Sequence, residues 1–361
     1  MLKIIIYSDM FYTTHPYLDI PLYNYIKNKG INVAYALHEK DIRLTNKDLY
    51  TIYSKINLLT VKKPKHLGSL FTSGDVLVMR WAYKLDGDAA ARSVSHKNKV
   101  LMYDVPGIDI RLREAAAHYL AVKGDSLVQS VNKKFGKRYS KVTATGLLHG
   151  DLVNTTSVNK AEFMKSYGMD PNKKLLLLTP ANPGEAHMKG LKDDYTKIAN
   201  IVHRKCNNYE LAVKAHPNDY TAKIPAQPGI IHKNGHYGGR CSWEVFSPGI
   251  KVIKADEGYN AIMACDAILN VRSSLAMEIS LFKKPIININ RKKYITNWPF
   301  DPKCMMDINI SELRDVLDNN KYSSNDSAWD DYVKKHMHAN DGKAHERIGE
   351  MAIKILNGTL K

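Results

Sequence analysis

Short runs of apolar residues alternate with amphipathic stretches along the whole chain. The runs of strand length, each followed by a segment long enough for a helix, predict strands at residues 3–7, 31–37, 76–79, 100–103, 175–179, 210–214, 252–254, 267–271 and 286–289. Strands that alternate with helices in this way are typical of parallel sheets with helices on both faces. The pattern therefore predicts an α/β protein.

A gap in this pattern near residues 150–170 divides the strands into two series. A chain of 361 residues exceeds the usual size of one hydrophobic core, so two doubly wound, Rossmann-like domains are expected. We place them at residues 1–165 and 166–342, and expect a terminal amphipathic helix at about 343–361 to pack back on the first. The acidic segment 311–331 is expected to form a surface helix and loop.

The segment 266–290, DAILNVRSSLAMEISLFKKPIININ, combines a strand, a polar turn, a helix and a second strand. The turn is Arg272, Ser273 and Ser274, and the expected helix covers residues 275–282. Either serine is a suitable N-cap. A helix that begins beyond the carboxyl end of a parallel strand presents free N–H groups and a positive dipole end. The segment therefore predicts a phosphate site.

A second candidate lies in ELAVKAHPND, residues 210–219, where His216 directly follows a strand and Pro217 ends it. The imidazole could donate to a phosphate, or it could simply bind a carbonyl of the turn. Because the 272–274 turn follows in the same expected sheet, the two features together favour phosphate. Lys214 and Arg272 would add positive charge that stabilises a leaving diphosphate without an obligatory metal, and no DxD motif follows a strand.

A strand that ends in His-Pro, followed later by SSxxxE and a Lys-Pro stop, resembles the C-terminal domain of GT-B glycosyltransferases. It is similar to the HP and SS elements of bacterial sialyltransferases, capsule transferases and teichoic acid glycerophosphotransferases. The resemblance covers roughly residues 170–295. It implies a GT-B fold, with two Rossmann-like domains facing across a cleft, and a nucleotide sugar, here taken as a UDP-sugar. It also implies that His216, Ser273 and Ser274 hold the donor phosphate and that Glu278 binds ribose; a solvated helix glutamate is the alternative.

The first half is expected to supply the general base that removes the proton of the acceptor hydroxyl during inverting transfer. Asp104 directly follows a predicted strand, and Asp109 lies in the same loop. Asp19, expected at a helix N-terminus where it could merely cap the helix, and His15 are further candidates. The segment KVLMYDVPGIDIRL, residues 99–112, resembles the strand and TDIRLP loop that carry the catalytic aspartate in the DNA β-glucosyltransferases of T-even phages. This resemblance implies that the catalytic aspartate is either Asp104, by its position after the strand, or Asp109, by the DIRL match. The spacing between the strand and DIRL differs from the family pattern.

The charge balance changes the expected acceptor. The chain holds 53 Lys and Arg against 36 Asp and Glu, a formal net charge of +17, and most of the surplus lies in residues 1–150. DNA or an anionic membrane would explain this surplus, and so would a simple contribution to solubility. Basic and aromatic side chains lie close together after one predicted strand, and a lysine-rich run follows later in the chain; both are candidate DNA contacts. The alternative for the first group is core packing, and the alternative for the lysine-rich run is a solvated loop. These candidates are Arg80, Trp81, Lys84, Arg111, Lys133, Lys134, Lys137 and Arg138.

The sequence thus predicts a metal-independent, inverting glycosyltransferase acting on a hydroxymethylated pyrimidine in double-stranded phage DNA, whose target base must be flipped out. Alternatives are a transferase of the same fold for a cell-envelope glycan or teichoic-type polymer, and a non-catalytic nucleic-acid-binding protein with a regulatory nucleotide pocket. A nucleotide-sugar epimerase is less favoured because an SGG-type turn is absent. Without a long apolar run, a signal peptide or a CxxC pair, the chain is expected in the cytoplasm, that of the host if phage-encoded.

Overall fold

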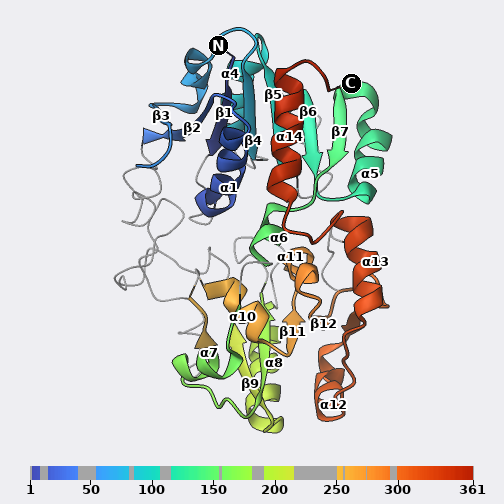
Figure 1. Cartoon of the computed structure of the whole chain (residues 1–361). Coiled ribbons are helices and arrows are strands. Elements are labelled where there is room, and N and C mark those ends of the chain that lie inside the picture. The colour runs from blue at the N-terminus through green and yellow to red at the C-terminus, as the bar shows by residue number, and fades with distance from the viewer. Residues whose placement is uncertain are drawn as a thin grey trace. The chain divides into compact units, whose positions relative to one another are not determined.

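The computed structural model describes most of the chain. The described residues are 2–8, 15–39, 54–80, 85–105, 115–153, 157–180, 191–214, 250–254, 257–273, 275–292 and 299–360. They form two compact units, residues 1–154 with 333–361, and residues 155–332. The division therefore falls at 154/155, whereas the sequence predicts it at 165/166. Each unit is built around one parallel sheet, which confirms the predicted two-domain α/β class (Figure 1).

The first unit contains a seven-stranded sheet in the order β3-β2-β1-β4-β5-β6-β7. Its strands are β1 (Ile4–Ser8), β2 (Val33–His38), β3 (Leu58–Val61), β4 (Val76–Arg80), β5 (Lys99–Val105), β6 (Tyr119–Val122) and β7 (Lys141–Ala144). All neighbouring strands are parallel. Alternate residues face opposite sides, so Ile4 and Ile6 join one core cluster while Ile5 and Tyr7 join the other. Burial on both faces explains why β1, β2 and β4 are nearly continuous apolar runs.

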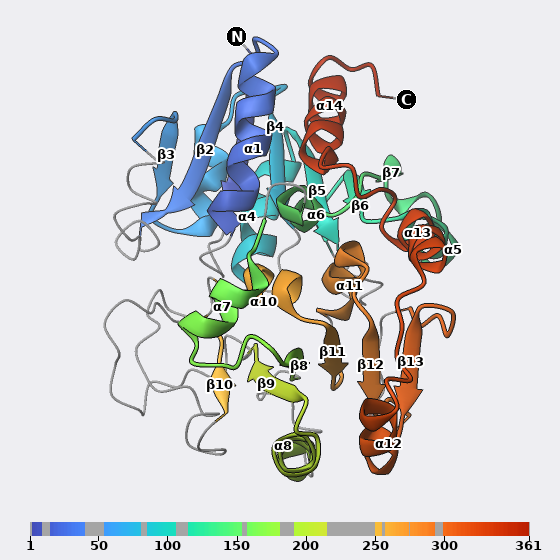
Figure 2. The same cartoon turned by 60° about the horizontal axis from the view of Figure 1, so that its bottom comes forward.

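Two groups of helices cover this sheet. One face carries α1 (His15–Asn28), α6 (Leu148–Val153) and α14 (Ala344–Leu356). The other carries η1 (Pro64–Leu70), α4 (Leu85–Ser95) and α5 (Asp125–Phe135), with η3 (Gly136–Arg138) after α5. Figure 2 shows α1 and α14 on the same side of the sheet. They pack closely, because a Cβ added to Gly349 would lie 2.6 Å from Cδ1 of Tyr25.

The second unit contains a six-stranded parallel sheet in the order β10-β9-β8-β11-β12-β13. Its strands are β8 (Lys174–Thr179), β9 (Tyr209–Val213), β10 (Lys251–Val252), β11 (Ala267–Asn270), β12 (Ile286–Ile289) and β13 (Met305–Ile308). Strand β8 comes first in the chain and lies in the middle of the sheet. The strand order therefore reverses between β8 and β11, and ligands of doubly wound folds bind beyond the carboxyl ends of the strands at such a point.

Helices cover both faces of the second sheet. The core on one face includes α8 (Leu191–Lys205) and α12 (Leu313–Asp318), which follows η7 (Ile310–Glu312). On the opposite face, α10 (Gly258–Ala264) contacts β8 and α7 (Lys160–Ser166). Helix α11 (Ala276–Ile279) continues into η6 (Ser280–Phe282) and joins α10 through side-chain contacts. Helix α13 (Asp326–His336) contains the boundary between the units.

The segment 311–331 is less exposed than its acidic composition suggested. Leu313 and Leu317 in α12 are buried against the sheet, and Trp329 in α13 is fully buried. The acidic residues of this segment are exposed in η7, α12 and α13, and Asp318 in α12 pairs with Arg314. The expectation of a surface helix and loop is therefore correct for the carboxylates only, because the apolar residues between them complete the core.

Candidate functional site

The carboxyl ends of the second sheet carry a buried row of polar side chains. Thr179 Oγ1 donates to Asn270 Oδ1 at 2.9 Å, and Asn270 Nδ2 donates to Asn288 Oδ1 at 2.9 Å. The three residues are register partners on β8, β11 and β12, and each is 1% exposed. Asn288 Nδ2 has no hydrogen-bond partner. Such a row within an otherwise Leu- and Ile-rich sheet places polar groups beside the point where the strand order reverses.

A charged group lies at the carboxyl edge of the second sheet, on the side of α10 and α11. Its members are Lys214, Tyr259 and Glu278. Tyr259 Oη donates to Glu278 Oε2 at 2.8 Å, and the Tyr259 ring stacks on Phe282 with centroids 5.9 Å apart. Lys214 follows β9, and a Cβ added to Gly258 would lie 2.5 Å from its Cε. Burial lowers the pKa of Lys214, and the negative charge of Glu278 opposes this shift. The fold thus brings together Lys214 and Glu278, both predicted, and adds Tyr259.

The predicted phosphate turn has an unusual backbone. Arg272 has a φ of 62°, in the left-handed region that few non-glycine residues adopt. Ser273 Oγ accepts a hydrogen bond from the backbone N of Leu275 at 3.3 Å. The helix expected over 275–282 is in fact the short α11 followed by η6, so its dipole is weaker than a full helix would supply. The role predicted for this turn therefore depends more on its side chains than on a long helix.

In the first unit, Asp19 is the best-defined of the candidate bases. Helix α1 begins at His15, so Asp19 lies inside the helix. The sequence had suggested that Asp19 lies at the N-terminus of the helix. It is fully buried and accepts hydrogen bonds from Tyr35 Oη at 3.0 Å and Tyr103 Oη at 2.7 Å. Arg80 Nη2 lies 3.4 Å from its Oδ1. Burial raises the pKa of Asp19, and Arg80, Tyr103 and Tyr35 oppose the rise.

Arg80 is buried, whereas its predicted role in DNA contact requires an exposed side chain. Its side chain is 8% exposed, and its guanidinium lies over the Tyr103 ring at 5.8 Å from the centroid. The physical reason is the buried negative charge of Asp19, with which it pairs. Arg80 and Asp19 both lie near the carboxyl ends of the central strands, since Arg80 ends β4.

Several other candidates can be placed only in part. Asp104 belongs to β5 and His15 begins α1, but their side chains are not described. The remaining candidates without a described position are Trp81, Lys84, Asp109, Arg111, His216 and Ser274. These residues lie outside the described ranges, so their roles stay predictions.

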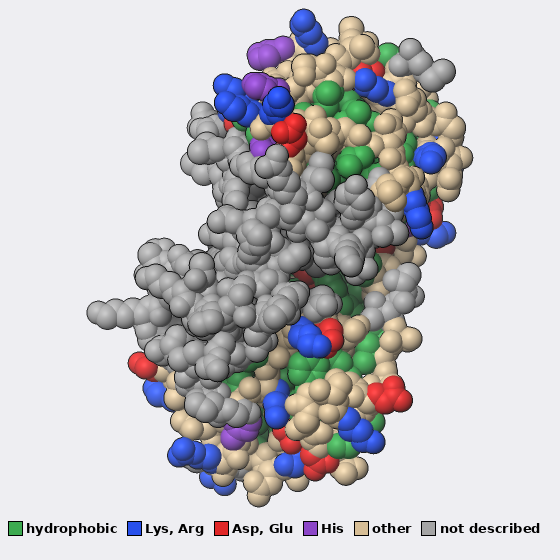
Figure 3. Space-filling view, turned by 90° about the vertical axis from the view of Figure 1, so that its left-hand side faces the viewer, with side chains coloured by type: hydrophobic (Ala, Val, Ile, Leu, Met, Phe, Trp, Pro, Cys, Tyr) green, Lys and Arg blue, Asp and Glu red, His purple; other side chains and the backbone are tan. Residues whose placement is uncertain are grey.

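Exposed cations gather where α5 ends and β7 begins. We define the basic face as Lys133, Lys134, Lys137, Arg138 and Lys141, all of which are exposed. None of the ion pairs found among the described residues involves this face. Figure 3 shows a different face, on which Lys and Arg gather with histidines on the first unit and mix with acidic side chains on the second. The exposed cations of the basic face therefore belong to the first unit.

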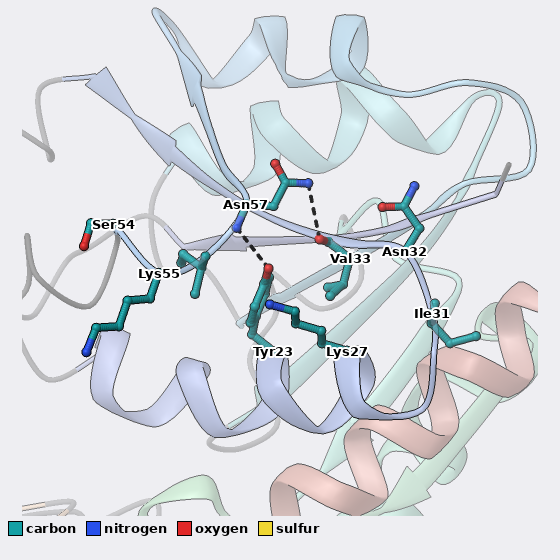
Figure 4. A pocket seen from close by; sticks show the side chains of 9 residues that line it. Tyr23, Lys27, Ile31, Asn32, Val33, Ser54, Lys55 and Asn57 are labelled. Atoms are coloured by element: carbon teal, nitrogen blue, oxygen red, sulfur yellow. Dashed lines mark hydrogen bonds between the residues drawn. The ribbon is translucent and has the colours of Figure 1, made fainter.

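A shallow pocket of about 470 Å³ opens at the amino ends of β2 and β3 (Figure 4). Tyr23, Lys27 and Asn57 are among its lining residues, and Tyr23 Oη accepts a hydrogen bond from the Asn57 backbone N at 2.9 Å. The pocket lies at the opposite end of the strands from Asp19 and Arg80. It is therefore separate from the cluster around Asp19.

In the described parts of the chain, no group of three or more His, Cys, Asp or Glu side chains could hold a metal ion. Among the described helices, none has the length and apolar character needed to cross a membrane.

Sequence comparison identifies no relative: no family model matches the chain, and no curated protein matches it. Solved structures do match. The S. aureus MnaA–UDP co-structure is 13% identical with a TM-score of 0.61, covering 100% of this chain and 98% of that one. A putative UDP-N-acetylglucosamine 2-epimerase from Listeria monocytogenes is also 13% identical, with a TM-score of 0.63 and the same coverages.

The wall teichoic acid polymerase TagF is likewise similar in fold. It is 11% identical, with a TM-score of 0.57, and the match covers 99% of this chain and 89% of that chain. At such identities the similarity establishes architecture alone. Together with the two parallel-sheet units, these matches confirm the GT-B fold predicted from the sequence.

Proposed function

We propose that the chain is a glycosyltransferase that binds a nucleotide-diphosphate sugar, with UDP as the nucleotide, at the carboxyl edge of the second sheet. The observation that carries this proposal is the group of Lys214, Tyr259 and Glu278 beside the reversal of strand order. An ammonium and an oriented carboxylate at this edge suit the phosphate and the hydroxyl groups of one ligand. Fold neighbours named for UDP and for teichoic acid polymerisation support a sugar-nucleotide substrate.

In this proposal the donor is divided between two sets of side chains. The diphosphate is held by Lys214, His216, Arg272, Ser273 and Ser274. Glu278 accepts hydrogen bonds from the ribose hydroxyls, and Tyr259 orients its carboxylate. As the bond between the anomeric carbon and the diphosphate oxygen breaks, the electron pair leaves with the diphosphate. The cations stabilise this developing charge, so the proposed route needs no metal ion.

The first unit supplies the base in the same proposal. A carboxylate removes the proton of the acceptor hydroxyl while its oxygen bonds to the anomeric carbon, which inverts the configuration. Asp104 and Asp109 are the candidates that follow β5, and Asp19 and His15 are the others. The acceptor we propose is the hydroxymethyl group of a modified pyrimidine in double-stranded DNA, with a teichoic-type polymer as the alternative that the fold of TagF favours.

The direct test is the consumption of UDP-, CDP- and GDP-sugars. Each donor is incubated with hydroxymethylcytosine DNA, unmodified DNA or a glycerol-phosphate polymer, and release of the nucleoside diphosphate is measured. We expect release that depends on one acceptor, with the added sugar detected on that acceptor by mass. Conversion of the donor to a sugar epimer without release would indicate an epimerase, a fold neighbour's activity. Nucleotide binding without any consumption would indicate a non-catalytic binding protein.

The basic face is proposed to bind the phosphates of the acceptor. Changing Lys133, Lys134 and Lys137 to Glu should weaken DNA binding at least about tenfold and flatten its dependence on salt, since each phosphate contact contributes about 0.9 to the slope. The measurement is a titration of duplex DNA at several salt concentrations. The matched control changes the exposed Lys165, Lys303 and Lys335 to Glu, which alters the net charge equally. Equal losses in both triple variants would show that net charge, and not this face, determines binding.

A further inference from the structure

Strand β5 contains an irregularity just before it ends. Met102 is the register partner of Leu120 on β6, whereas Val105 is the partner of Val122. Strand β5 therefore has one residue more than β6 over this interval. A bulge of this kind bends the strand and changes the direction of the side chains that follow, and bulges are frequent beside active sites. The interval contains Tyr103 and Asp104, one of the two residues proposed as the base.

Asp19 is bonded to the irregular part of β5 through Tyr103. Tyr103 Oη donates to Asp19 Oδ1 at 2.7 Å, and both residues are fully buried. The same carboxylate accepts from Tyr35 on β2 and pairs with Arg80 on β4. One side chain of α1 thus connects three strands of the first sheet near their carboxyl ends.

Such an arrangement is costly for folding alone. A buried carboxylate loses its hydration, and a buried ion pair often contributes no more than apolar residues of similar volume would. The other side chains on this face of the sheet are mostly apolar. The polar cluster also lies near the carboxyl ends of the strands, where doubly wound folds bind ligands. Both facts favour a role in arranging the site.

We infer that Asp19 is a positioning residue for Asp104 and not itself the base. Resting on the proposed function, this inference assigns Asp19 the task of anchoring Tyr103, and thereby the bulged interval of β5 that contains Asp104. Asp19 is 0% exposed and already accepts two phenol hydroxyls and pairs with a guanidinium. Because Asp19 is 0% exposed, an acceptor hydroxyl could reach its carboxylate only if the side chains around it moved.

The test compares two tyrosines that make the same kind of bond. Tyr103→Phe and Tyr35→Phe each remove one phenol hydroxyl from Asp19, and both side chains are 0% exposed. Only Tyr103 adjoins Asp104. We expect similar unfolding midpoints but a fall in kcat of at least about tenfold for Tyr103→Phe alone, with the donor KM unchanged, because small misplacements of a catalytic group are expensive. Amide hydrogen exchange at residues 103–105 should also be faster in that variant only.

The outcomes separate this inference from the proposed function. Equal kcat values and equal exchange rates in the two variants would overturn the positioning role. If the wild type consumes no donor, the proposed function fails, and exchange at 103–105 alone decides whether Asp19 anchors β5. Asp19→Asn provides a further check on its chemistry. If the base were Asp19 itself, that variant would lose the acidic limb of the kcat/KM pH profile while Tyr103→Phe kept it, and the inference would be wrong.

Discussion

Replacing Asp104 by Asn should lower kcat by about 10²-fold or more, because the amide cannot take the proton of the acceptor hydroxyl. The substitution preserves the shape of the side chain, so the fold and the affinity for the donor should not change. Asp104 is preferred over Asp109 because it lies in β5, within the interval whose backbone is fixed by the bulge and by the Tyr103 hydroxyl. The measurement is the initial rate of nucleoside diphosphate release at saturating donor and acceptor.

Asp109→Asn is the matched control for this experiment, since it makes the same chemical change five positions along the chain. We expect its kcat to remain within about tenfold of the wild-type value, a smaller effect than the loss of a general base. The reverse result would assign the base to Asp109, in line with the DIRL resemblance. Near-native rates in both variants would exclude both residues and leave Asp19 or His15 as the base.

The central strands could be predicted from the sequence because both of their faces are buried. The predicted strand at 286–289 coincides with β12, and those at 76–79 and 175–179 fall within β4 and β8. By contrast, β3, β7 and β13 contain exposed or polar residues. Their pairing depends on neighbouring strands that are distant in sequence, and local apolar runs do not reveal such neighbours.

The candidate site was predictable to the extent that its residues follow strands. Lys214 could be placed at the carboxyl edge because it directly follows an apolar run, and Glu278 because it lies one turn beyond the serines. Tyr259 was missed, since an aromatic residue in a short helix is equally typical of core packing. The row formed by Thr179, Asn270 and Asn288 was missed because it depends on the register of three strands. Register is a tertiary property that one sequence does not display.

Removing the charge of Lys214 should weaken donor binding by about 1.5–3 kcal/mol, the range for hydrogen bonds to charged groups, which corresponds to about 10- to 150-fold in Kd. Lys214→Met keeps most of the apolar stem that lies against Gly258, so packing should be preserved. Calorimetric titration with UDP and with uridine tests the assignment. Affinity for UDP should fall while affinity for uridine stays the same, because only UDP carries the diphosphate.

The pH dependence of UDP binding gives a second, independent readout of Lys214. Burial lowers its pKa, so the ammonium loses its proton at a lower pH than an exposed lysine would, although Glu278 opposes this. Only the protonated form attracts the diphosphate, so wild-type affinity should decrease as pH rises through that lowered pKa, and Lys214→Met should lack this decrease. Lys254→Met is the control, because Lys254 lies just after β10 and its side chain is 67% exposed. If both variants lost UDP affinity equally, a general effect of positive charge would explain binding, and Lys214 would have no specific place in the donor site.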